Sequence, residues 1–171
     1  MVAGCSEAYR LEVVRPRAQD LRIERQGWER VRVDPLEHAW YRGRMRAQIR
    51  LDQPDWRWQG PDIPDSKPPF HDLFTDPQGR IWVVRQGPGR VLEEGLQEPE
   101  DPLDHFRRPR WEDSWILDVF APDGRYLGAV GVPPEMQVEP LPRVDGEQLI
   151  ALVEDPERGP LVRIYRLSLP E

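Results

Sequence analysis

The sequence predicts a mainly β protein with one inserted helix near residues 35–50. A Pro- and Gly-containing turn occurs twice, as Asp-Pro-Gln-Gly-Arg at residues 76–80 and as Pro-Asp-Gly-Arg at residues 122–125. Both turns have strand-like apolar runs beside them. Proline fixes φ, aspartate bonds its own backbone and glycine adopts positive φ, so each turn predicts an antiparallel hairpin. The 20 prolines of the chain also argue against an all-helical fold, because proline breaks helices.

The first expected element is a hairpin within residues 1–33. Residues 9–14 alternate apolar and polar side chains, and residues 21–25 alternate again after a turn that contains Pro16. A period of two is typical of a strand with one buried face. We therefore expect these two runs to pair with each other.

Residues 34–69 predict a helix followed by an extended connector. Asp34 and Pro35 form an N-cap and first-turn signal, and Glu37 occupies the capping-box position. The connector, residues 53–69, contains five prolines together with Trp56 and Trp58. The pattern predicts an amphipathic helix of about four turns. Its predicted buried stripe consists of residues at helical spacing: Leu36, Ala39, Trp40, Gly43 and Ala47.

Residues 70–133 predict four strands. The first two, residues 70–74 and 81–86, are joined by the turn at residues 76–80, and the last two surround the second turn. Between the two pairs lies a long acidic insertion, residues 88–113. A loop longer than about 15 residues commonly has a function of its own, so this insertion is a candidate functional segment.

Residues 134–171 predict three strands, at residues 137–141, 148–153 and 161–167. Asp145-Gly146 and the turn at residues 155–159 are the predicted reversals between them. No fourth strand is predicted after the third.

This order of elements resembles the blades of a β-propeller, in which each blade is a four-stranded antiparallel sheet. Residues 70–82 (an aromatic, a short strand, Asp-Pro-x-Gly-Arg, then Ile-Trp-Val) and residues 115–127 carry the resemblance. Both look like blade signatures of bacterial six-bladed propellers of the NHL and TolB-like kind. Residues 148–167 resemble a closing blade, whose last strand waits for a partner strand.

The resemblance implies antiparallel four-stranded propeller blades in a partial propeller of about two and a half blades, because one blade takes about 40 to 50 residues. A partial ring leaves sheet edges and blade faces exposed. We therefore expect a protein partner or self-association through exposed blade edges. The whole of residues 1–171 would form this single domain, as the C-terminal portion of a longer parent or as a chain that is completed by other chains.

Composition excludes several classes of partner. The net charge of −7 disfavours nucleic acid, whose phosphates bind clusters of Lys and Arg. Cys5 is the only cysteine, so no internal disulfide forms. No apolar run approaches the roughly 20 residues of a membrane span. The sequence as given carries no signal peptide, which predicts a cytoplasmic protein; a start farther upstream would favour the periplasm or the cell surface.

The sequence contains no catalytic constellation, and we expect no metal and no cofactor. His38, His71 and His105 show no metal-ligand spacing. His71 beside Asp72 could form a base with an orienting carboxylate, but a lone His-Asp pair is more commonly structural. Trp56 and Trp58 could form a recognition surface, since they lie in a proline-rich connector. These four residues are the candidate site residues.

The leading functional hypothesis is a non-catalytic propeller segment that acts as a binding or assembly module. One alternative is a fragment of a propeller enzyme, a hydrolase or lyase that uses His71 or Asp72 at the mouth of the channel. Another is a truncated gene product without independent function, which the missing blades suggest.

Overall fold

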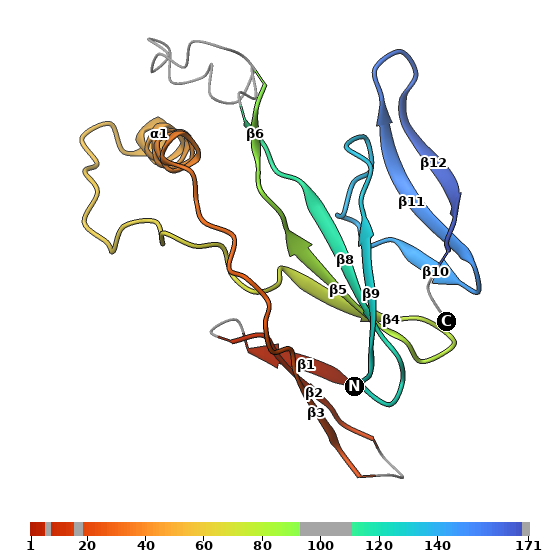
Figure 1. Cartoon of the computed structure of the whole chain (residues 1–171). Helices are drawn as coiled ribbons and strands as arrows, with labels where there is room; N and C mark the ends of the chain where they lie inside the picture. The colour runs from red at the N-terminus through yellow and green to blue at the C-terminus, as the bar shows by residue number, and fades with distance from the viewer. Residues whose placement is uncertain (6–7, 16–18, 93–110, 169–171) are drawn as a thin grey trace. The chain divides into compact units, whose positions relative to one another are not determined.

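A computed structural model of the chain describes residues 1–5, 8–15, 19–92 and 111–168 (Figure 1). The described part forms two compact units: unit 1 comprises Met1–Glu29, Pro68–Gly87 and Trp115–Glu171, and unit 2 comprises Arg30–Lys67 and Pro88–Ser114. The elements in chain order are β1 (Val2–Cys5), β2 (Arg10–Val13), β3 (Leu21–Glu24), α1 (Pro35–Asp52), β4 (Asp72–Thr75), β5 (Ile81–Gln86), β6 (Arg90–Val91), β7 (Trp111–Glu112), β8 (Trp115–Phe120), β9 (Tyr126–Gly131), β10 (Arg143–Asp145), β11 (Gln148–Asp155) and β12 (Gly159–Arg166).

Unit 1 begins with a three-stranded antiparallel sheet in the order β1-β2-β3. The predicted pairing of the first two alternating runs is confirmed, with Leu11 opposite Ile23. β1 is a third strand that the sequence did not predict, because its small residues show little alternation. Gly4 in this strand lies so close to Phe70 that an added Cβ would come within 2.4 Å of the ring, which explains why glycine occupies this position.

The central sheet of unit 1 has four antiparallel strands in the order β4-β5-β8-β9, and it confirms the four strands predicted within residues 70–133. Gly79 and Gly124 adopt φ values of 76° and 93°, as the two turn signals predict. The Asp76 carboxylate accepts hydrogen bonds from the Arg80 backbone N–H at 2.9 Å and from Trp82 Nε1 at 2.9 Å. The first turn is therefore fixed to the strand that follows it.

The last sheet of unit 1 has three antiparallel strands in the order β10-β11-β12. The prediction of a first strand at residues 137–141 is wrong, because the strand that pairs with β11 is Arg143–Asp145. Pro140 and Pro142 lack a backbone N–H and so limit ladder formation before residue 143. The predicted reversals are confirmed, with positive φ at Gly146 and Gly159.

Two apolar cores lie on opposite faces of the central sheet, because alternate side chains of β5 and β8 belong to different clusters. Trp82 and Val84 pack with the side chains of the last sheet, such as Val153. Ile81 and Val83 pack with the side chains of the first sheet. Unit 1 is therefore a stack of three sheets whose middle layer is buried on both faces.

Unit 2 contains α1 and the ends of the acidic insertion. The predicted capping box is confirmed. Asp34 accepts a hydrogen bond from the Leu36 backbone N–H at 2.8 Å, and the Glu37 carboxylate accepts one from the Asp34 backbone N–H at 3.4 Å. The helix buries Glu37 rather than Leu36, whose side chain is exposed, so the predicted stripe is wrong at this position. Trp40, Gly43 and Ala47 are buried as predicted, whereas Ala39 is exposed.

The predicted fold class is confirmed at the level of a mainly β chain with antiparallel sheets and one helix. The strands that the structure describes form four open sheets, of which β6 and β7 form the smallest. These two short strands hold the ends of the acidic insertion together, with Arg90 opposite Glu112. The middle of the insertion, with His105, lies outside the described residues.

Candidate functional site

The structure does not bring His71 and Asp72 together as a catalytic pair. His71 Nε2 lies 2.7 Å from Glu139 Oε1, and its ring packs on Trp115 with a centroid distance of 5.1 Å. The Asp72 carboxylate accepts a hydrogen bond from the Leu73 backbone N–H at 2.7 Å instead. Both histidine and aspartate are exposed, so this part of β4 lacks the sheltered geometry that general base catalysis needs.

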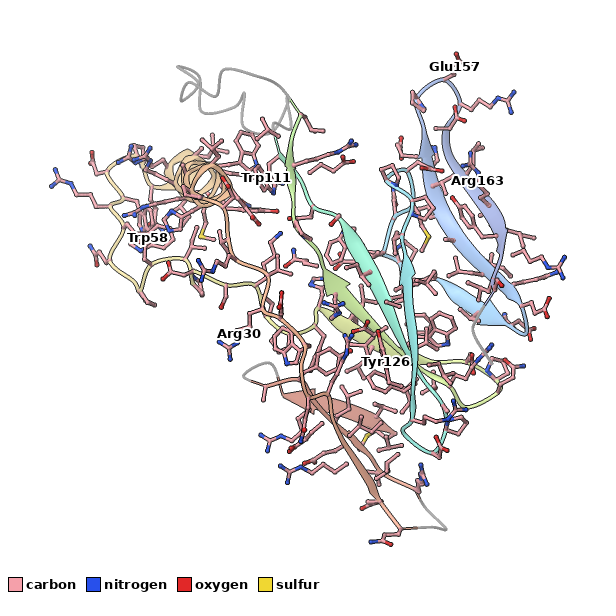
Figure 2. All side chains as sticks on the ribbon, in the orientation of Figure 1. Arg30, Trp58, Trp111, Tyr126, Glu157 and Arg163 are labelled. Carbon is pink, nitrogen blue, oxygen red and sulfur yellow. The ribbon has the colours of Figure 1, made fainter. Side chains whose placement is uncertain are left out.

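Trp56 and Trp58 do meet, as an edge-to-face pair in unit 2 with ring centroids 5.9 Å apart. Trp58 lies beside α1, where the Arg42 guanidinium stands 5.3 Å from its ring centroid (Figure 2). Its Nε1 donates to the Gly60 carbonyl at 2.9 Å. The Arg50 side chain donates to the Trp56 carbonyl at 3.1 Å. These contacts fix the proline-rich connector on the helix and account for both tryptophans structurally.

A shallow pocket of about 400 Å³ lies beside Trp56. All of its walls come from one stretch of the connector, Gln53–Gln59. A ligand pocket normally gathers side chains from several elements around a mostly apolar wall. This pocket is therefore a weaker candidate than the sheet edge described below.

Sequence reasoning missed a buried polar network in unit 1, centred on Asp118 of β8. Its carboxylate is fully buried and accepts hydrogen bonds from Tyr9 Oη at 2.7 Å and Tyr126 Oη at 3.0 Å. Arg25 donates to Oδ2 from Nη1, and Arg85 forms a second ion pair with the same oxygen. One carboxylate thus holds two guanidinium groups, one from Arg25, which directly follows β3, and one from Arg85 of β5.

The surroundings of Asp118 change the acidity of its tyrosine partners. Burial raises the pKa of Tyr9 far above its ordinary value, and the Asp118 charge acts in the same direction. Burial followed by the same charge raises the pKa of Tyr126, which lies at the start of β9 (Figure 2). In unit 2, burial and then the hydrogen bond to Asp113 raise the pKa of Tyr41.

These shifts predict an alkaline loss of stability. An unfolded tyrosine ionises near pH 10, whereas Tyr9, Tyr41 and Tyr126 keep their protons to higher pH in the folded chain. Above about pH 10 the folded state therefore binds more protons than the unfolded state. These groups give the free energy of unfolding no pH dependence below about pH 10, and they make it fall as the pH rises above that value. Urea unfolding between about pH 8 and pH 12, followed alongside tyrosinate absorbance, checks this.

Tyr9→Phe is the control variant for that titration. It removes the most buried phenol of the three, so the alkaline decline should become shallower. About half of the full tyrosinate absorbance from the folded wild-type chain at about pH 10 would contradict the shifts, because every phenol would then titrate at its ordinary pKa.

Unit 2 holds a second buried charge cluster, centred on Lys67, the only lysine of the chain. Its Nζ lies 2.8 Å from Glu37 Oε1 and 2.7 Å from Asp113 Oδ1, and the lysine side chain is 3% exposed. Tyr41 donates its hydroxyl hydrogen to the other Asp113 oxygen. The cluster joins the connector, α1 and the segment after β7, and it explains why Glu37 is buried.

The feature that best fits a binding role is the outer edge of β12 (Figure 1). Among the described strands, β12 pairs with β11 alone, over eight residues from Gly159 to Arg166. Val162 and Ile164 in its centre are 71% and 61% exposed. In the ladder with β11, Val162 stands opposite Leu152 and Ile164 stands opposite Ile150. These four side chains lie on the face of the sheet that points away from the core. A long sheet edge with exposed branched apolar residues readily accepts another strand.

The alternation of hydrogen-bonded and non-hydrogen-bonded pairs between β12 and β11 identifies which backbone groups of β12 point to the outer edge. Leu167 N donates to Glu147 O at 2.7 Å, so the odd-numbered residues of β12 form the hydrogen-bonded pairs with β11. Gln137 N donates to Leu152 O at 2.9 Å from the other side of β11, which fixes the same phase. The N–H and C=O groups of Val162, Ile164 and Arg166 therefore point away from β11.

Pro160 is also one of the residues whose backbone points away from β11, so the N–H that proline lacks removes no hydrogen bond to β11. The two arginines of the strand are both engaged: Arg163 lies 2.8 Å from Glu135, and Arg166 lies 3.3 Å from Glu147. Neither contact occupies the outward backbone groups. The edge thus combines three outward backbone positions, Val162, Ile164 and Arg166, with an apolar centre and balanced charges.

The comparisons with known proteins add no relative. No family model, no curated protein and no solved structure matches the chain. Within residues 1–5, 8–15, 19–92 and 111–168, no helix combines the length and apolar character of a membrane span. In the same residues, no three His, Cys, Asp or Glu side chains gather as a metal site would require.

Proposed function

We propose that this chain is a non-catalytic β-sheet module, a partial β-propeller of the NHL and TolB-like kind, that functions by binding an extended strand along the free edge of β12. The observation that carries the proposal is the outward edge of β12, with exposed Val162 and Ile164 at its centre. Main-chain hydrogen bonds supply affinity in this mode of recognition, and alternate side chains supply specificity.

The three stacked sheets of unit 1 support the propeller part of the proposal. Each sheet is antiparallel, the sheets follow one another along the chain, and the middle one has the four strands of a blade. In such a stack each of the two outer sheets packs on the central sheet with one face, and no other sheet of the described residues covers its second face. A module of this kind is completed by contact with another polypeptide, which makes binding its most natural role.

The propeller-enzyme alternative gains no support from the described residues. The imidazole of His71 pairs with Glu139, and the carboxylate of Asp72 is engaged by the backbone of Leu73. The Asp118 carboxylate is likewise engaged by its own tyrosine and arginine partners.

Titration of the chain with a capped synthetic peptide of residues 159–166 tests the proposal. We expect the peptide to bind one site, and we expect Ile164→Pro to weaken binding by about tenfold or more, because it removes an outward N–H and its branched side chain. Ile164→Val keeps both features and is the matched control. Proline at this position leaves the ladder with β11 intact, since Ile164 N–H does not point toward β11.

Equal thermal stability of the two variants confirms that both are folded. Absence of peptide binding to the folded wild-type chain would contradict the proposed function. So would equal binding to the proline variant, because the peptide would then occupy some other surface.

A further inference from the structure

We propose that the strand bound at the β12 edge is β12 of a second copy of this chain, paired antiparallel about a two-fold axis at Ile164. This inference rests on the proposed binding function and specifies its partner. The argument follows from which residues of β12 can stand opposite one another without losing hydrogen bonds or opposing like charges.

The hydrogen-bond phase limits the possible registers. A two-fold axis perpendicular to the sheet pairs one residue with its own copy, and that residue must direct its backbone groups outward. The candidates are therefore Val162, Ile164 and Arg166. A register centred on Arg163 is excluded, because its N–H and C=O already bond to β11.

Two of the three candidate registers are unfavourable. Centring on Val162 places Ile164 opposite Pro160, which has no N–H to donate, so two hydrogen bonds of the symmetric ladder are lost. Centring on Arg166 places two guanidinium groups opposite each other, and like charges in direct opposition destabilise a sheet.

The register centred on Ile164 has neither defect. Val162, Ile164 and Arg166 each exchange both backbone bonds with the second copy, which gives six bonds to the symmetric ladder. Ile164 packs against its own copy, and the exposed face of Val162 and Ile164 becomes continuous across the axis. Arg163 then faces Tyr165 of the other copy, an arrangement suited to stacking of a guanidinium on an aromatic ring.

The charges of the strand agree with a second copy as the occupant. Arg163 and Arg166 are each paired with a glutamate of their own chain, Glu135 and Glu147. Two copies of β12 therefore approach as nearly neutral strands, despite the net charge of −7 on each chain. The outward Pro160 of each copy also limits the symmetric ladder at both ends, which helps to define a single register.

Disulfide trapping tests the pairing and its register together. In a Cys5→Ser background, Ile164→Cys places two thiols directly opposite, with Cα atoms about 5.5 Å apart, within the range that a disulfide spans. Val162→Cys is the matched control, because its copy lies four residues along the strand, about 13 Å away. With oxidised glutathione as the oxidant, we expect about tenfold more covalent dimer from the first variant than from the second.

The solution mass of the Cys5→Ser parent, measured by light scattering, accompanies the trapping experiment. We expect twice the chain mass of 20.1 kDa at high concentration and the monomer mass after Ile164→Pro. Preferential trapping of Cys at position 162 would overturn the register. A parent that stays monomeric and does not cross-link would overturn the second-copy inference. If that monomer still binds the peptide of residues 159–166, the proposed function survives this failure; if it does not, both fail.

Discussion

Asp118→Ala is expected to lower the free energy of unfolding by about 3–5 kcal/mol, the cost of removing one partner from a buried ion pair. The substitution leaves the guanidinium groups of Arg25 and Arg85 without their carboxylate, with side chains only 20% and 11% exposed. It also removes the acceptor of the Tyr9 and Tyr126 hydroxyl groups. Urea unfolding at neutral pH measures the loss.

Asp123→Ala is the control for this prediction, because Asp123 is an exposed turn residue whose carboxylate accepts a hydrogen bond from the Arg125 N–H. Its loss should cost about 1 kcal/mol. The double variant Asp118→Leu with Arg85→Met should recover part of the stability, since it leaves one unpaired guanidinium, that of Arg25, in place of two. A cost below about 1 kcal/mol for Asp118→Ala would contradict the burial of the network.

Lys67→Met is expected to destabilise unit 2 by a similar amount, about 3–5 kcal/mol. The variant leaves the carboxylates of Glu37 and Asp113 close together without the cation that both contact. Hydrogen exchange of the α1 amides measures this effect within unit 2, because the helix depends on the cluster for its buried face.

A second substitution distinguishes charge from packing in this cluster. Lys67→Met with Glu37→Gln removes one of the two carboxylates and keeps the capping-box hydrogen bond that glutamine also makes. We expect it to be more stable than Lys67→Met alone. Arg42→Met serves as the surface comparison, since the Arg42 and Asp62 ion pair is exposed and such pairs contribute about 1 kcal/mol or less. Equal losses from Lys67→Met and Arg42→Met would contradict the account.

Local signals in the sequence were sufficient for the turns and the helix. The Asp-Pro-x-Gly-Arg turn works through backbone preferences of adjacent residues, and Gly79 and Gly124 take positive φ as those preferences require. The same holds for the helix, whose capping box needs only Asp34 and Glu37. Features of this kind depend on few residues, so they are visible without knowledge of the fold.

The two buried charge clusters depend instead on contacts between distant parts of the chain. Asp118 meets Tyr9 across 109 residues and Arg25 across 93. One local signal could have drawn attention to it, since Asp118 interrupts the apolar run Trp-Ile-Leu-Asp-Val-Phe. A charge in such a run is buried when both faces of a sheet are covered, and it then needs partners.

The misplaced first strand of the last sheet has a similar cause. Residues 137–141 have a strand-like composition, and Val138 is buried. Backbone pairing at this place is nevertheless limited to single contacts, such as the bridge between Met136 and Val153. The register of β11 with Arg143–Asp145 is set by the tight turn at Gly146, and a tight turn outweighs composition in fixing which residues pair.

The resemblance to a closing blade predicts a last strand that waits for a partner, but it does not predict the chemistry of the outer edge of β12. The outward position of Val162, Ile164 and Arg166 follows from the ladder with β11, which a sequence does not reveal. The exposure of the two apolar side chains likewise depends on which face of the sheet meets the core.

Amide hydrogen exchange along β12 tests the binding role of this edge most directly. In dilute protein, we expect slow exchange at Leu161, Arg163 and Tyr165, which bond to β11, and fast exchange at Val162, Ile164 and Arg166. Addition of the peptide of residues 159–166 should slow the second set and leave the first unchanged. Protection of all six amides in the monomeric chain before any peptide is added, or fast exchange of the outward set at saturating peptide, would contradict a free edge that binds a strand.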